Sequence, residues 1–170
     1  MRILLSWIAG LLCIGASAQQ PPLQTVNHVA LEKYMGTWYE IAAFPQSFQK
    51  GCSCTTAEYS LQPDGSVKVT NSCNRSGKRK VRTAKARVTD PATNAKLSVQ
   101  FFWPFKGQYW IIDLDDAYTY AVVGHPSRKY LWILSRSPYM PELQYEQIVQ
   151  RILAKGYDAT QLRKTVQACN

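Results

Sequence analysis

The chain has 170 residues, five cysteines and a formal net charge of +9 at pH 7. With 46% hydrophobic residues it is long enough for one domain with a sizeable core, which excludes a disordered or low-complexity protein. The positive charge suggests a nucleic acid or an anionic surface as a partner. The export signal at the N-terminus argues against nucleic acid.

Residues 1–18 have the features of a signal peptide. Arg2 supplies the positive start, residues 3–14 are largely apolar, and Ala16-Ser17-Ala18 is a small-x-small cleavage site. The apolar stretch is too short to cross a bilayer. We therefore expect an exported protein, either periplasmic or secreted, and association with the outer membrane is a further option.

Cys13 lies within this leader and raises the alternative of a lipid anchor. The residue before a lipidated cysteine is normally small, whereas here it is Leu12, so we expect no anchor. The mature chain then consists of an irregular lead-in, residues 19–35, and one domain, residues 36–170.

Eight segments of alternating apolar and polar residues follow, and each is typical of a β-strand. Turn residues such as Pro63-Asp64-Gly65 separate several of them. The predicted strands cover residues 37–44, 55–61, 66–72, 80–88, 97–102, 108–114, 119–124 and 130–135. Most are joined by short turns, as an antiparallel up-and-down sheet requires.

The apolar period changes after the last strand. Residues 141–155 carry Leu143, Ile148, Ile152 and Leu153, broadly on one face of a predicted helix. A second short helix at residues 158–164 is an option, after which the chain can return to the sheet. The sequence thus predicts an all-β fold, an eight-stranded antiparallel up-and-down barrel with a C-terminal helix packed outside. Closing the barrel leaves room for one small ligand, and a two-sheet sandwich is the alternative.

Four cysteines remain after the leader, and an even number in an exported chain favours two disulfides. They are Cys52, Cys54, Cys73 and Cys169. Three pairings are open. A zinc site at Cys52-Ser53-Cys54 is the weaker alternative, because neither histidine is spaced as a ligand.

Seven basic residues between positions 75 and 87, with no acidic residue among them, account for most of the charge. They can keep an edge hairpin soluble and unpaired. Alternatively, they contact the headgroups of an anionic membrane. The residues assigned to that contact are Arg75, Lys78, Arg79, Lys80 and Arg82.

Three motifs resemble the signatures of the lipocalin family. Gly36-Thr37-Trp38 matches the first signature, G-x-W. Residues 113–118 match the second loosely, and residues 131–136, which end in Arg136, match the third. Residues 101–107 and 130–138 are similar to the group that includes the bacterial outer-membrane lipocalin and apolipoprotein D. The resemblance covers essentially the whole mature chain.

The lipocalin resemblance implies that Gly36, Trp38 and Arg136 close one end of the barrel. A planar guanidinium stacked on an indole gains cation–π attraction, so the role of this group is structural. The resemblance also implies the disulfides Cys54–Cys169 and Cys52–Cys73. The second is not standard in the family, so an exchange between Cys52 and Cys54 stays open.

Alternation along each strand predicts which side chains line the interior. If Arg136 faces inward, Leu134, Trp132 and Tyr130 do too, whereas Lys85 and Arg87 face water. One-residue bulges would invert such assignments. The predicted cavity wall comprises Ala57, Tyr59, Val69, Asn71, Ala84, Ala86, Leu97, Val99, Phe101, Tyr109, Ile111, Ala121, Val123, Tyr130 and Trp132.

An apolar interior with small residues predicts a chain-like ligand such as a fatty acid or a lysophospholipid, bound for envelope lipid transport, storage or repair. Each buried methylene contributes about 0.8 kcal/mol, so no charged anchor is needed inside. Any headgroup lies at the mouth. No cofactor or metal is expected, and a solid core is the alternative to a cavity.

Two other functions are weighed: an enzyme or isomerase of this fold acting on a lipid-like substrate, and a secreted module that binds another protein. Asp113, Asp115 and Asp116 could act as paired carboxylates, but their position in a turn favours capping. His28 and His125 have no nucleophile at a convincing spacing, and neither is predicted inside, which argues against a haem carrier. A homodimer stays an option.

Overall fold

The computed structural model describes residues 20–102 and 104–169, without the side chains of Phe101, Phe102 and Phe105. The predicted signal peptide, its cleavage site and Cys13 lie outside the described residues. No helix within residues 20–102 and 104–169 is long and apolar enough to span a bilayer.

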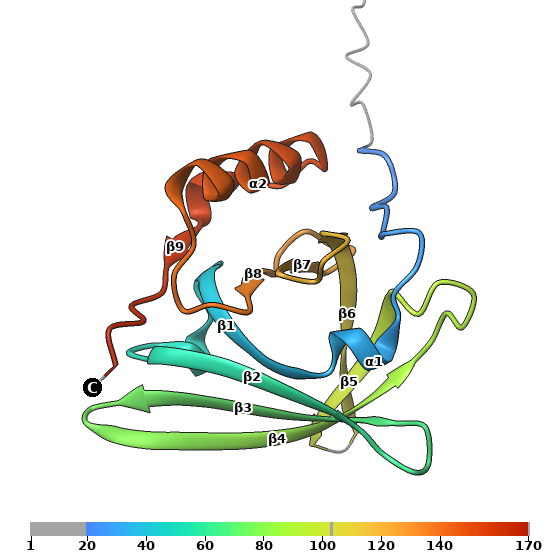
Figure 1. The fold of residues 1–170 in the computed structure, drawn as a ribbon, viewed down its shortest axis with the longest axis horizontal. Coiled ribbons are helices and arrows are strands. Elements are labelled where there is room, and N and C mark those ends of the chain that lie inside the picture. Colours follow the sequence, from blue (N-terminus) through green and yellow to red (C-terminus); the bar gives the residue numbers. More distant parts are fainter. Residues whose placement is uncertain (1–19, 103, 170) are drawn as a thin grey trace, which may run out of the picture.

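Eight antiparallel strands in the described part of the chain close into a barrel (Figure 1). They follow one another around the sheet in chain order, and β1 pairs with both β2 and β8. The strands are β1 (Gly36–Ala43), β2 (Ser53–Leu61), β3 (Val67–Arg75), β4 (Lys78–Val88), β5 (Lys96–Phe102), β6 (Phe105–Leu114), β7 (Tyr120–Gly124) and β8 (Leu131–Ser135). This is the predicted architecture, and the β3–β4 hairpin extends further toward its tip than expected.

The C-terminal segment adds a short ninth strand, β9 (Arg163–Lys164), after the 3-10 turn η2 (Ala159–Gln161). β9 pairs with Ala42 and Ala43 of β1. A few residues later the carbonyl of Val166 accepts a hydrogen bond from the amide of Cys54 in β2, at 2.7 Å. The tail therefore bridges β1 and β2 where these strands separate.

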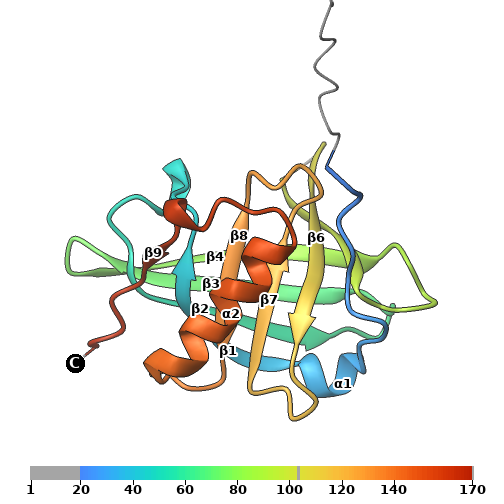
Figure 2. The ribbon, with the colours of Figure 1, turned by 90° about the horizontal axis from the view of Figure 1, so that it is seen from above.

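Two apolar clusters lie on opposite sides of the sheet. One fills the barrel interior. The other lies between the sheet and the helix α2 (Glu142–Ala154), where Ile148 and Ile152 pack against Leu131 and Ile133. Figure 2 shows α2 lying across the strands from outside, as predicted. The ion pair between Asp113 Oδ2 and Arg151 Nε, at 2.7 Å, also ties the helix to the barrel.

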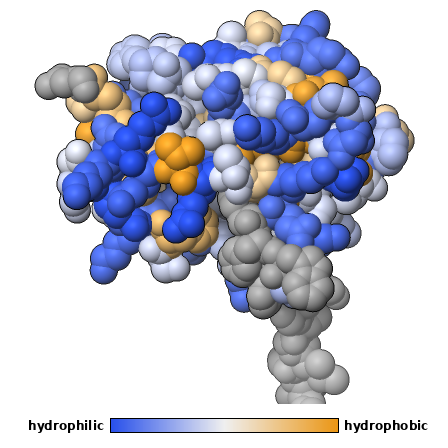
Figure 3. Space-filling model, turned by 90° about the horizontal axis from the view of Figure 1, so that it is seen from below, coloured by the Kyte–Doolittle hydropathy of each residue, from blue (hydrophilic) through white to orange (hydrophobic). Residues whose placement is uncertain are grey.

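No helix among residues 20–102 and 104–169 covers the outer face of β2, β3 and β4, and Figure 3 shows this face as mostly hydrophilic. Burial alternates along these strands: Val67, Val69, Ala84 and Ala86 are buried, whereas Lys85 between the two alanines is exposed. Alternation follows from the pleat, which points successive side chains to opposite faces.

One helical turn, α1 (Leu31–Tyr34), interrupts the lead-in that was expected to be irregular. Val29 and Tyr34 are buried in the interior cluster. The amide of Val29 donates to the carbonyl of Thr93 at 2.8 Å. The lead-in is therefore part of the packed structure and covers one end of the barrel.

Candidate functional site

The covered end of the barrel is built around Trp38, which is fully buried on β1. The Arg136 guanidinium lies over its ring, 3.8 Å from the centroid, which is the contact that the family resemblance implied. Gly36 has φ +94°, and a Cβ there would lie 3.4 Å from Arg136 Nη1. A glycine therefore suits both the backbone and the close approach of the guanidinium.

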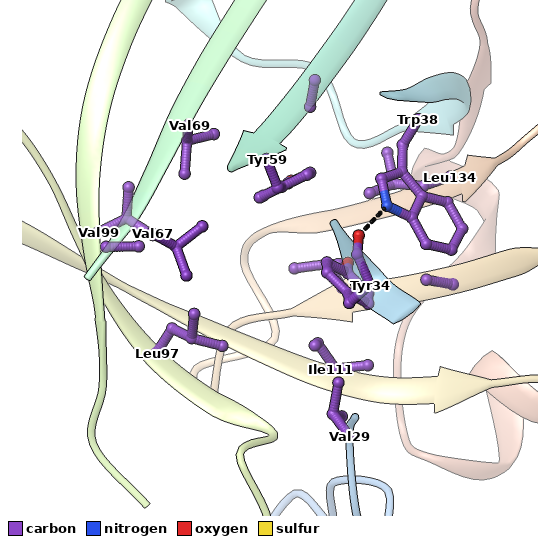
Figure 4. Close-up of a cluster of buried hydrophobic side chains, with 14 of the residues drawn as sticks. Val29, Tyr34, Trp38, Tyr59, Val67, Val69, Leu97, Val99, Ile111 and Leu134 are labelled. Carbon is purple, nitrogen blue, oxygen red and sulfur yellow. Dashed lines mark hydrogen bonds between the residues drawn. The ribbon is translucent and has the colours of Figure 1, made fainter. Parts of the chain in front are cut away.

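Hydrogen bonds hold this closed end together. Arg136 donates to three carbonyls: Nη1 to Thr37 at 2.9 Å, and Nη2 to Lys33 at 2.7 Å and Met35 at 2.8 Å. The indole of Trp38 donates to the carbonyl of Tyr34 at 2.8 Å (Figure 4). The carbonyls at the end of α1 thus gain partners, and α1 is fixed across the end of the barrel.

Three tyrosine hydroxyls meet just above the closed end. Tyr109 Oη lies 2.6 Å from Tyr34 Oη and 2.8 Å from Tyr59 Oη. Burial raises the pKa of Tyr59 to about 12 and raises the pKa values of Tyr34 and Tyr109 well above the ordinary 10.0. All three phenols are therefore protonated near neutral pH and can keep the hydrogen bonds that join α1, β2 and β6.

Most of the predicted wall residues do share the barrel interior. The buried members are Ala57, Tyr59, Val69, Ala84, Ala86, Leu97, Val99, Ile111, Ala121 and Val123, and the partly buried Tyr109 and Trp132 pack against them. One predicted residue is placed differently: Tyr130 precedes β8, is 38% exposed and stacks on Trp132. Asn71 is partly buried, and the side chain of Phe101 lies outside the described part.

The half of the interior next to the closed end, called the lower half from here on, is filled; the half next to the open end is the upper half. The space enclosed there has a volume of about 10 Å³, roughly what one water molecule needs. Its lining includes seven predicted wall residues: Tyr59, Val69, Ala86, Leu97, Val99, Tyr109 and Ile111. The sequence suggested a cavity along the whole wall, but large buried side chains occupy this part, and Figure 4 shows Tyr59, Leu97 and Ile111 pointing into it from separate strands.

The interior toward the open end has a different character. On β4 the small side chain of Ala84 follows Ala86 on the inward face, and Trp132 near the start of β8 is packed against the interior cluster yet partly exposed. Ala57 and Ala121 lie near the closed end instead, opposite Trp38 and Leu134. Neither Ala84 nor Trp132 borders the small enclosed space. A ligand that enters the barrel therefore meets these residues before it reaches the tyrosines.

Glu40 is a buried carboxyl group in this upper half that sequence reasoning missed. Its Oε1 accepts from Thr165 Oγ1 at 2.6 Å, and its Oε2 accepts from Gln49 Nε2 at 2.7 Å. Gln49 Oε1 in turn accepts from Trp132 Nε1 at 3.3 Å. Burial raises the pKa of Glu40, and the two hydrogen bonds oppose that rise. Alternation from inward-facing Trp38 would have placed Glu40 inside.

Gln49 belongs to the 3-10 turn η1 (Ser47–Gln49) in the loop between β1 and β2. This loop is at the open end, because β1 runs from the closed end toward it. The hydrogen bonds of Gln49 to Glu40 and to Trp132 thus join this loop to both β1 and β8. We call this link the Gln49 latch.

The C-terminal tail closes the seam between β1 and β2 on the same side. Gln167 Nε2 donates to the carbonyls of Glu40 at 2.8 Å and Thr55 at 2.9 Å. The disulfide Cys54–Cys169 then joins the tail to β2 covalently. This pairing and Cys52–Cys73 are the two that the resemblance implied.

The basic hairpin of β3 and β4 forms another edge of the open end. Register pairs Lys80 with Cys73 and Arg82 with Asn71. Because β4 alternates, Lys80 and Arg82 share the inward face of Ala84, although both side chains are exposed at the mouth. Basic side chains therefore border the route into the apolar interior.

Two acidic residues before β7 have structural roles, one in the turn and one in attaching α2. Asp115 Oδ1 accepts from the amides of Thr119 at 2.6 Å and Tyr120 at 2.9 Å, which is the capping role that the turn suggested. Asp113 instead pairs with Arg151 of α2, a partner that sequence spacing could not indicate. His125 lies in the turn after β7, where its Nδ1 lies 2.8 Å from Ser127 Oγ.

Comparison with known proteins gives a consistent result. A family model for the lipocalin-like domain matches residues 29–167. Temperature-induced lipocalin-1 of Arabidopsis thaliana is 41% identical, with 88% of this chain and 86% of that protein covered. The outer membrane lipoprotein Blc of Escherichia coli K12 is 38% identical, with 89% and 88% covered.

Apolipoprotein D of Mus musculus is 33% identical, with 87% of this chain and 81% of that protein covered. Among solved structures, insecticyanin from Manduca sexta superposes with a TM-score of 0.70 at 23% identity, with 86% and 85% of the two chains covered. At that identity the structural match supports the fold alone.

Proposed function

The chain belongs to the lipocalin family of proteins that bind small hydrophobic ligands, and we propose that it carries or stores a fatty acid or a lysophospholipid in the upper half of the barrel. The observation that carries this proposal is the contrast inside the barrel. Its lower half is filled, whereas toward the mouth it is lined by the small side chain of Ala84 and the partly exposed Trp132.

An acyl chain fits this environment better than a compact polar molecule. Each methylene group transferred from water contributes about 0.8 kcal/mol, so a chain of moderate length binds without an internal charge. The charged groups near the route are at the mouth, where Lys80 and Arg82 follow Ala84 on the inward face of β4. An anionic headgroup would lie there and the chain would extend toward Trp132.

The cellular role that we propose is lipid transport or repair in the cell envelope, by a protein exported to the periplasm or secreted. Two disulfides favour an oxidising compartment. A relative of similar length is an outer membrane lipoprotein by name. A carrier is favoured over an enzyme because the interior carboxyl group, Glu40, is engaged by Thr165 and Gln49.

The first experiment identifies the ligand directly. The protein is purified from its own host, extracted with organic solvent, and the extract is analysed by mass spectrometry. We expect a fatty acid or lysophospholipid in stoichiometric amount, and we expect Trp132 fluorescence to respond when the lipid is added back. Turnover of an added lipid would instead support the enzyme alternative.

A pair of variants on β4 tests the location. Ala84→Trp fills the upper interior, and overpacking of this kind should weaken acyl-chain binding about tenfold or more. Thr83→Trp adds the same ring on the exposed outer face and should leave binding unchanged. Equal affinities in the two variants would place the ligand outside the barrel and refute the proposed site.

A further inference from the structure

Two neighbouring features at the open end carry unpaired positive charge and exposed apolar side chains. One is the tip of the β3–β4 hairpin, Arg75 to Arg82, and the other is the η1 turn with Phe48. Each could be an ordinary surface feature. Their attachment to one another distinguishes them from the rest of the surface.

The hairpin cations are not neutralised by the protein itself. In the part of the chain that the structure describes, five ion pairs are present, and none uses a basic residue of the hairpin tip. Further along the same strand, Lys85 and Arg87 do pair with Asp64, at 2.7 and 3.3 Å. The tip therefore offers its full charge to an external anion.

Apolar side chains are exposed next to this charge. Phe48 is 62% exposed on η1, and Val81 is 51% exposed on β4. Arg75 Nη2 donates to the carbonyl of Phe48 at 2.8 Å, and the Arg75 Nε is a buried donor without a partner among the described residues. Aromatic side chains next to basic ones are typical of protein surfaces that bind at a membrane interface.

A covalent bond joins the two features. Cys52 follows η1 by three residues, and its disulfide to Cys73 reaches β3 at the position opposite Lys80, with 5.5 Å between the Cα atoms. Phe48 and the hairpin therefore cannot move apart independently. This gives a role to the disulfide that is not standard in the family.

We propose that η1 and the β3–β4 hairpin form one docking platform, locked by Cys52–Cys73, that seats the open end of the barrel on an anionic lipid bilayer. The cations contact the headgroups while Phe48 enters the interface. The barrel mouth then faces the membrane, so that a lipid can pass between bilayer and interior with little exposure to water. The docking does not depend on which ligand the barrel holds.

The test measures partitioning of the disulfide-bonded protein onto phosphatidylcholine vesicles with and without phosphatidylglycerol. We expect binding to the anionic vesicles, weaker binding to the neutral ones, and a loss of binding as salt is raised. Equal binding to both vesicle types would overturn the proposal. Binding to dextran sulfate with none to vesicles would also overturn it, because the surface would then serve a soluble polyanion.

Two charge-reversal variants distinguish the effect of the platform on vesicle binding from the effect of the protein's net charge. Lys78→Glu with Arg79→Glu should reduce partitioning about 25-fold or more, since each basic residue near an anionic surface contributes about fivefold. Lys33→Glu with Lys68→Glu makes the same change in net charge at exposed positions toward the closed end and should have a much smaller effect. Equal losses in both would show that only net charge matters.

A second pair tests the apolar contact independently of charge. Phe48→Ser should weaken binding about tenfold, because one partly inserted aromatic ring is lost. Leu143→Ser removes an equally exposed apolar side chain from the outer surface of α2 and should leave binding unchanged. An unchanged affinity for Phe48→Ser would remove η1 from the platform.

Discussion

The two ends of the barrel differ in how many of their polar and charged groups have a hydrogen-bond or ion-pair partner within the protein. At the closed end, Arg136 finds three backbone carbonyls and the ring of Trp38, and the space above is about 10 Å³. At the open end, within the described residues, Thr55 Oγ1 and Arg75 Nε are buried without partners. None of the ion pairs among the described residues uses a cation of the hairpin tip there.

This difference indicates that the closed end stabilises the fold, whereas the open end can bind and release other molecules. Interactions that are complete within the protein stabilise it and leave nothing for a ligand to replace. Groups left incomplete lower stability but can bind something from outside. The Gln49 latch and the C-terminal tail are intermediate between the two ends, because their polar groups are paired but hold the open end through only a few hydrogen bonds. The comparison predicts different consequences for substitutions at the two ends.

The largest expected effect is at the closed end. Trp38→Ala removes a fully buried indole and the surface on which Arg136 stacks, and should lower the free energy of unfolding by about 4 kcal/mol. Urea denaturation measures this. Tyr139→Ala, at a side chain that is 73% exposed, should change it by less than about 0.5 kcal/mol. Similar losses in both would mean that the closed end does not carry the stability.

Removal of the tail disulfide comes next. Cys54→Ser with Cys169→Ser should cost about 3 kcal/mol, because a crosslink across 115 residues restricts the unfolded chain strongly. Cys52→Ser with Cys73→Ser opens a loop of only 21 residues and should cost less. Denaturation midpoints of the two double variants give the order. The reverse order would show that native contacts of the platform outweigh chain entropy.

A smaller effect on stability is expected at the latch. Gln49→Ala removes a donor to the buried Glu40 carboxylate and should cost about 1–2 kcal/mol. It should also speed release of a bound fatty acid, since η1 is freed from Trp132, and stopped-flow fluorescence can measure this. Gln46→Ala in the same loop serves as the control. Unchanged release would mean that the latch does not control access to the interior.

The smallest effect is a change in pH dependence. Burial raises the folded-state pKa of Glu40 above 4.5, so its stabilising contribution is present below that pH and is lost as pH rises through the raised value. Glu40→Gln can keep both hydrogen bonds, because Thr165 Oγ1 can accept instead of donate. Unfolding free energies of the variant should therefore fall less between pH 4 and pH 8, about the range that brackets this titration. Parallel curves for the two proteins would contradict this.

Strand positions could be predicted because alternation and turn residues are local signals. The helix at Glu142–Ala154 was predicted from its apolar period for the same reason, but only Ile148 and Ile152 of its predicted apolar face are buried, whereas Leu143 and Leu153 are exposed. The four-residue helix α1 is too short to produce a period, so the lead-in was expected to be irregular. The two disulfides follow from family resemblance, since the cysteine count alone allowed three pairings.

The filled lower half of the barrel could not be predicted in the same way. Alternation states which face a side chain occupies, but not how far it reaches or what it meets. Tyr34, Tyr59 and Tyr109 come from three separate elements, and only the folded chain brings their hydroxyls within hydrogen-bonding distance. The bulge between Glu40 and Ala42 likewise shifts the register of β1 against β8 without a glycine to mark it.

The bridging position of β9 determines the order in which the molecule can be completed. Residues 163–169 are synthesised after all eight barrel strands, yet they join β1 to β2 and carry the second half of a disulfide. A growing chain can align its first eight strands but cannot seal this seam until Cys169 has been synthesised. A fusion partner added after residue 170 would begin two residues from Cys169, beside the seam itself.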